Sequence, residues 1–139
     1  PGLMRQVVAE AITTICGYVS DNNAMVRDSA MWTLSVMCAE FSDIVLSAQF
    51  LDGVLGVVAP TLQMDSGMTC RGAAVIHNLC LHFDDDDDDD ENGPKNTNEL
   101  SPYYEGMVTG LLAVLDRPDV DDHMRHDTQE ALNRLFGAA

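Results

Sequence analysis

The sequence predicts an all-α protein built from paired helices. Two observations favour this class: apolar residues recur at helical spacing, and no strand-length window alternates apolar with polar residues. The predicted helices are Leu3–Val19, Met25–Phe41, Ile44–Leu62, Met68–Phe83, Pro102–Leu115 and Met124–Phe136.

The breaks between these segments carry residues that stop helices, such as the Ser-Asp-Asn-Asn run at 20–23 and the Asp-Arg-Pro-Asp run at 116–119. Most breaks are short, so helices that follow each other in sequence should pack antiparallel. The expected N-caps, whose side chains accept hydrogen bonds from the first turn, are Asn23, Asp43, Ser66, Ser101 and Asp122.

Composition limits the function classes. The chain has 139 residues, 46% of them apolar, without a run of eighteen apolar residues or a signal sequence, and it begins at Pro1 rather than Met. It is interpreted as a soluble fragment of a longer protein. The net charge of −16 opposes direct nucleic-acid binding and membrane insertion and favours basic protein partners.

The four cysteines lie within apolar stretches and form no close CxxC pair, which indicates buried, reduced thiols. Reduced thiols are typical of the cytosol or the nucleus.

An internal repeat gives the helices their expected order. The stretch Val26–Cys38 aligns with Met68–Cys80 at an offset of 42, and apolar residues match along the core stripe. The sixth helix joins the series through Met124, Leu132 and Leu135 once about fourteen extra residues in 84–101 are allowed for. A two-helix repeat of about forty residues is typical of HEAT and armadillo solenoids. The predicted units are 1–41, 42–83 and 102–139, with an acidic disordered loop over 84–101.

A second signal lies at the turns, where an Asp precedes an Arg by six residues. Asp21 precedes Arg27, and Asp119 precedes Arg125. Such pairs could join neighbouring repeats in a ladder of charge-assisted hydrogen bonds. The middle unit departs from the pattern, and short Asp and Arg spacings also arise by chance.

These Asp-x5-Arg pairs, each with an apolar residue before the Arg, resemble the HEAT motif. The run Val26-Arg27-Asp28-Ser29-Ala30-Met31-Trp32-Thr33-Leu34 resembles a nearly identical run that opens a second helix in the importin β family. Further along, Ser101–Glu105 and the Asp-Arg-Pro-Asp turn at 116–119 are similar to a later repeat of that family.

The resemblance implies a right-handed superhelical HEAT solenoid of three two-helix repeats, part of a nuclear import receptor in the cytoplasm, the nucleus and the nuclear pore. Second helices would line an inner face that grips the basic segment of importin α or a basic cargo segment. First helices would contact nucleoporin Phe-Gly repeats, and Ran GTPase would bind elsewhere on the full-length receptor. A generic HEAT scaffold is the alternative.

Trp32 corresponds, by this resemblance, to a family Trp that stacks against the basic segment, and an indole face attracts Arg or Lys by cation–π contact. Asp28, four residues earlier on the same helix face, and Glu40 could pair with guanidinium groups. The other interpretations are a Trp packed against the next repeat and a solvated carboxylate face. Ala74 stands where the family has a second Trp.

The acidic run is expected to form a disordered loop that attracts basic ligands or merely acts as a spacer. It consists of Asp84, Asp85, Asp86, Asp87, Asp88, Asp89, Asp90 and Glu91. A protein that buffers ions or histones through this run is a third hypothesis for the function.

No catalytic or cofactor motif occurs, so the sequence predicts neither an enzyme nor a cofactor. Metal binding is also not expected. His77 and His82 diverge on their helix, and His123 and His126 share a face but lack Cys or carboxylate partners fixed in the same geometry.

Overall fold

The computed structural model describes residues 2–47, 49–84 and 100–138, and all regular structure within them is helical. The all-α prediction is confirmed. The elements are α1 (Gly2–Tyr18), α2 (Ala24–Glu40), α3 (Ser42–Val45), α4 (Leu51–Thr61), α5 (Ser66–Asp84), the 3-10 turn η1 (Ser101–Tyr103), α6 (Tyr104–Leu115) and α7 (Asp122–Ala138).

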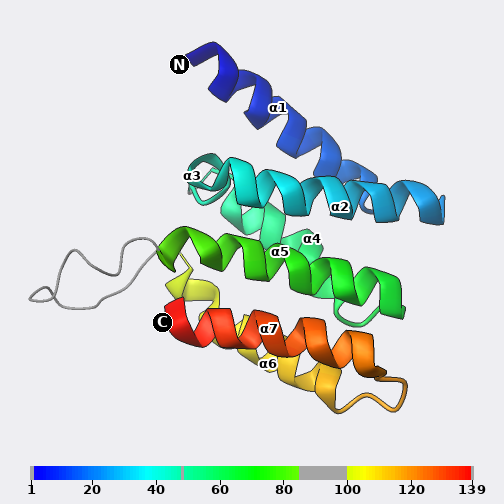
Figure 1. Ribbon diagram of the computed structural model, residues 1–139. Helices are drawn as coiled ribbons and strands as arrows, with labels where there is room; N and C mark the ends of the chain where they lie inside the picture. Colours follow the sequence, from blue (N-terminus) through cyan, green and yellow to red (C-terminus); the bar gives the residue numbers. More distant parts are fainter. Residues whose placement is uncertain (1, 48, 85–99, 139) are drawn as a thin grey trace, which may run out of the picture.

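Helices α2, α5 and α7 lie side by side in one layer, with α5 in the middle (Figure 1). Each packs against the helix that precedes it: α1 contacts α2, α4 contacts α5, and α6 contacts α7. The turns that link these pairs, at 19–23, 62–65 and 116–121, lie at one edge of the layer (Figure 1). None of the described helices is long and apolar enough to cross a bilayer.

One predicted helix is interrupted. The segment Ile44–Leu62 contains the short α3, then a break, then α4. Within the break Ser47 Oγ donates to the carbonyl of Ile44 at 2.8 Å, a local bond that competes with helix continuation. Apolar periodicity runs through the break, and for this reason the sequence prediction of a single helix was wrong.

The helix starts agree with expectation in part. Asn23 caps α2 as predicted, because its Oδ1 accepts from the Met25 and Val26 amides at 2.8 and 3.3 Å. At α7 the cap is Asp121 rather than Asp122, since Asp121 Oδ1 accepts from the Met124 amide at 2.8 Å. Asp43 lies inside the first turn of α3 instead of capping it.

Two further predicted caps are the first residues of their elements. Ser66 begins α5, and Ser101 begins η1.

The core is continuous through all the helix pairs. Positions aligned by the 42-residue offset are alike in burial: Leu34 and Ile76 are buried, and so are Cys38 and Cys80. Leu132, which the third unit places in the same series as Leu34, is buried as well.

The predicted boundaries of the acidic loop, 84–101, are too wide. Asp84 is the last residue of α5, Leu100 is only 2% exposed within the core, and Ser101 begins η1. Burial of Leu100 offsets the cost of ordering the chain at this end. The remaining acidic residues, Asp85–Glu91, lie outside the described residues, so the interpretation of the run as a disordered loop is not addressed by the structure.

Candidate protein-binding surfaces

The exposed face of α2 carries large apolar side chains. Met25, Trp32 and Val36 are 78%, 53% and 38% exposed, and their spacing of seven and then four residues places them on one face of the helix. We call these three residues the α2 stripe. Trp32 is thus about half exposed within the described part of the chain, and both a binding role and packing against a further repeat stay predictions.

Glu40 is exposed near the end of the same helix, where it adds a carboxylate beyond Val36. A negative group beside an apolar stripe suits a partner that combines aliphatic stems with positive ends. The structure therefore leaves both Trp32 and Glu40 accessible, as the predicted binding role requires.

Asp28 has a partner within the chain. Both of its carboxylate oxygens accept from Arg71 on α5, at 3.1 Å from Nε and 3.2 Å from Nη2, in a two-pronged pair that joins α2 to α5. The side chains remain 44% and 37% exposed for Asp28 and Arg71 respectively. Asp28 therefore joins α2 to α5. A guanidinium group of a ligand could bind Asp28 only by sharing its carboxylate oxygens with Arg71.

The Asp and Arg residues of the predicted ladder are paired differently in the structure. Arg27 Nη1 donates to the backbone carbonyls of Asp21 and Asn22 at 2.9 and 3.1 Å, so it closes its own turn. The carboxylate of Asp21 accepts from the Asn23 amide at 2.9 Å. Arg125 pairs with Asp122 at 3.2 Å within α7.

The third ladder residue, Asp119, pairs with Arg117 two positions away at 2.7 Å. This hydrogen bond holds the pKa of Asp119 below its ordinary value. The predicted pairing of these Asp and Arg residues was wrong, because the spacing of two residues along the sequence does not determine which side chains meet in the fold.

Arg117 makes the bonds between units that the ladder was expected to make. Its Nη1 donates to the carbonyl of Leu62 at 3.0 Å and to Thr69 Oγ1 at 2.9 Å, and its Nη2 donates to the carbonyl of Met64 at 2.7 Å. These acceptors lie at the α4–α5 turn, whereas Arg117 lies at the α6–α7 turn. One guanidinium thus ties two turns together: it donates to the Leu62 carbonyl and shares the Met64 carbonyl with Thr69 Oγ1, which lies 3.1 Å from it.

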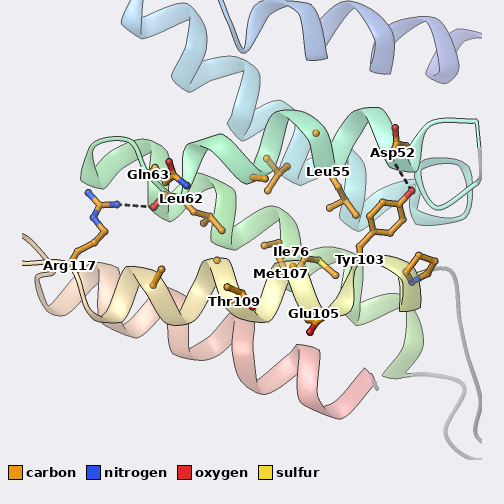
Figure 2. A pocket seen from close by; sticks show the side chains of 17 residues that line it. Asp52, Leu55, Leu62, Gln63, Ile76, Tyr103, Glu105, Met107, Thr109 and Arg117 are labelled. Carbon is orange, nitrogen blue, oxygen red and sulfur yellow. Dashed lines mark hydrogen bonds between the residues drawn. The ribbon is translucent and has the colours of Figure 1, made fainter.

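A groove of about 980 Å³ lies between α4 and α6 (Figure 2). Its floor is apolar and includes Leu55, Leu62, Ile76 and Met107. Small residues line both walls, from Gly56 and Ala59 on α4 to Gly106, Gly110 and Ala113 on α6. Because these positions carry no long side chains, the space between the two helices stays unfilled.

The two ends of the groove differ in charge. At one end the Tyr103 hydroxyl at the end of η1 donates to Asp52 at 3.3 Å, and Glu105 lies nearby in the first turn of α6; at the other end lie Gln63 and Arg117 (Figure 2). Sequence reasoning assigned outer contacts to the first helices without naming this groove. The signal was the recurrence of Gly and Ala on one face of 51–61 and of 104–115.

Comparison with known proteins supplies no relative from which a function could be transferred. No protein-family model matches the sequence, and no curated protein matches it. Function must therefore be argued from the α2 stripe and the groove themselves.

Proposed function

We propose that this chain is part of a HEAT-repeat solenoid of the importin β type and that it acts by binding other proteins. In this proposal the repeats are 1–41, 42–83 and 102–139, stacked as part of a right-handed superhelix. Support comes from the packing of each helix on its predecessor and from the matching burial at positions 42 residues apart. A stack of this kind presents the α2–α5–α7 layer on one side and α4 and α6 on the other.

The observation that carries the binding function is the exposure of Trp32 in the α2 stripe of a chain with a net charge of −16. A Trp face attracts Arg or Lys by about 0.5–2 kcal/mol, and its flat surface packs on the aliphatic stem. Met25 and Val36 extend that apolar contact along the helix. The partner that fits is an extended Arg/Lys-rich segment, such as the basic segment of importin α or of a cargo.

The groove suits a second class of partner. Its apolar floor and small walls accept an aromatic ring with little side-chain rearrangement, because no bulky residue must move from the walls. A Phe-Gly repeat offers such a ring next to a residue that has no side chain. We assign the groove to nucleoporin Phe-Gly segments; Ran GTPase would engage other parts of a full-length receptor, which would shuttle between cytoplasm and nucleus.

The basic-segment assignment is tested by fluorescence anisotropy with a labelled importin-α N-terminal peptide at low and at moderate salt. We expect weak binding that declines steeply with salt, because a single stretch offers few contacts and exposed charges are screened. Trp32→Ala should weaken it by about 2- to 30-fold, the equivalent of the cation–π energy above.

Phe136→Ala is the matched control, because Phe136 is an aromatic residue of similar exposure, 55%, on α7. It should leave the affinity unchanged. No binding at low salt, or equal losses for both variants, would contradict the assignment of the α2 stripe and favour a generic scaffold.

The groove is tested with a Phe-Gly peptide and the variant Gly106→Leu, which fills the space between α4 and α6. A Cβ at Gly106 meets no atom within 4 Å, so the fold should tolerate the change. Gly17→Leu on α1 is the control, since its Cβ also meets nothing within 4 Å and lies away from the groove. Loss of peptide binding in the first variant alone supports the assignment; retention in both refutes it.

A further inference from the structure

We propose that Cys70, His123 and Asp127 form a zinc-binding site that joins α5 to α7. One ligand atom from each of the three side chains can be chosen so that all lie within 4.8 Å of one another. Cys70 comes from the beginning of α5, and His123 and Asp127 come from the beginning of α7. His123 and Asp127 are one helical turn apart, so the two side chains share a face.

One of the three distances already agrees with tetrahedral coordination. Zinc binds imidazole nitrogen and carboxylate oxygen at about 2.0–2.2 Å and thiolate sulfur at about 2.3 Å, which gives edges of about 3.4 Å between N and O and about 3.6 Å between S and N. His123 Nε2 lies 3.4 Å from Asp127 Oδ2, already at the first of these edges. Cys70 Sγ lies within 4.8 Å of both ligand atoms and would approach to about 3.6 Å to complete a three-ligand set.

The carboxylate is held in place from its other side. Asp127 Oδ1 lies 3.3 Å from His126 Nδ1, while Oδ2 faces His123. Such a contact orients a metal-binding carboxylate and leaves one oxygen for the ion. His123 is 74% exposed, so a hydrated ion reaches the site from solvent.

The ligand set selects the metal. A thiolate together with imidazole and carboxylate suits zinc, whereas Ca²⁺ and Mg²⁺ prefer oxygen alone. Three protein ligands would leave a fourth coordination position for water.

The sequence did not indicate which ligands would meet the histidines at the start of this helix. Asp127 lies one turn after His123 on α7, and the packing of α5 on α7 brings Cys70 to the same place. Since the ligands come from two neighbouring helix pairs, the bound ion would hold the second and third units together.

The test uses the whole chain in reduced form and Co²⁺ as the spectroscopic probe for zinc. We expect one equivalent to bind with the visible bands of tetrahedral Co²⁺ and a near-ultraviolet thiolate-to-cobalt charge-transfer band. Zn²⁺ should then displace Co²⁺ and abolish both. Excess Zn²⁺ should raise the Tm of the chain, because the ion binds the folded state.

Cys70→Ser should remove the charge-transfer band, and His123→Ala and Asp127→Asn should weaken Co²⁺ binding by about tenfold or more. His123→Ala keeps the proposal testable if the Cys70 variant misfolds, because this exposed histidine contributes little to the core. Cys16→Ser and His77→Ala, on α1 and further along α5, are the matched controls and should bind as the parent does.

Three outcomes would overturn the site: no charge-transfer band in the parent chain, a band that survives Cys70→Ser, or unchanged affinity in His123→Ala. Co²⁺ held only by carboxylates of the acidic run would give no thiolate band and therefore counts as the first outcome.

Discussion

Helix α5 packs tightly against the end of α4 at Gly72, and the substitution Gly72→Ala tests this contact. An added Cβ would overlap Thr61 Oγ1 and lie 3.2 Å from Thr61 Cβ and 3.5 Å from Leu62 Cδ2. Thr61 is fully buried; its Oγ1 donates to the carbonyl of Val58 at 2.6 Å, and its own carbonyl accepts from Thr69 Oγ1 at 3.0 Å. Thr61 cannot move away without losing these bonds.

Two opposing effects set the magnitude. Overpacking of this kind costs about 1–3 kcal/mol, while replacing Gly by Ala inside a helix returns about 0.5–1 kcal/mol. We therefore expect Gly72→Ala to lower the free energy of unfolding by about 0.5–2 kcal/mol and the Tm by about 2–8 °C. Urea and thermal denaturation followed by far-ultraviolet circular dichroism measure both quantities.

The matched control is Gly56→Ala on α4, where a Cβ meets nothing within 4 Å and only the helix gain remains. It should stabilise the chain by about 0.5–1 kcal/mol. The double variant Thr61→Ala with Gly72→Ala removes the overlapping hydroxyl, so the two changes should couple favourably by about 1 kcal/mol. If Gly72→Ala stabilises the chain as much as Gly56→Ala does, the close approach is refuted.

Three other predictions concern polar groups. Arg117→Met should lower the free energy of unfolding, measured in urea, by about 2 kcal/mol, because the Leu62 and Met64 carbonyls and Thr69 Oγ1 lose the bonds that Arg117 donates. Arg117→Lys should recover less than half of this loss, because an ammonium group does not have the two-pronged geometry of a guanidinium. A loss below about 0.5 kcal/mol for Arg117→Met would contradict this. Asp28→Asn should lower the free energy of unfolding by less than about 1 kcal/mol, since the pair with Arg71 is half-exposed. It should also reduce the affinity for the basic peptide less than Trp32→Ala does. The reverse order in the anisotropy measurements would make Asp28 a contact of the peptide rather than a packing residue. Burial raises the pKa of Cys38 from 9.0 to about 12, so the contribution of the neutral thiol to stability is present below pH 9 and is lost as the pH rises towards 12. A Tm that does not change between pH 9 and 12, or rapid labelling of Cys38 by a thiol reagent near neutral pH, would argue against its burial.

Helix class and most helix positions could be predicted from the sequence, because periodicity and local capping are properties of neighbouring residues. Asn23 illustrates this, since the two amides that donate to its side chain lie within three positions. The break after α3 could not, because residues 46–50 keep the apolar pattern while Ser47 turns the chain through one local bond.

The candidate site was predictable only where one helix carries it. Trp32 and Glu40 are exposed as expected from the face of α2 on which they lie. The partner of Asp28 lies 43 positions away, and Arg117 reaches a carbonyl 53 positions away. Such pairs depend on the register between packed helices, which no short spacing encodes, and the same holds for the meeting of Cys70 with His123.

The arginines at the turn edge have a consequence for ionic strength. Arg27 donates to two uncharged backbone carbonyls within its own turn, and Arg117 donates to two carbonyls of another turn besides pairing with Asp119; screening by salt acts mainly on pairs of full charges at the surface. The bonds to carbonyls should therefore persist in concentrated salt, whereas attraction between the acidic surface and a basic ligand fades. Salt could therefore release a basic ligand from a scaffold that stays folded.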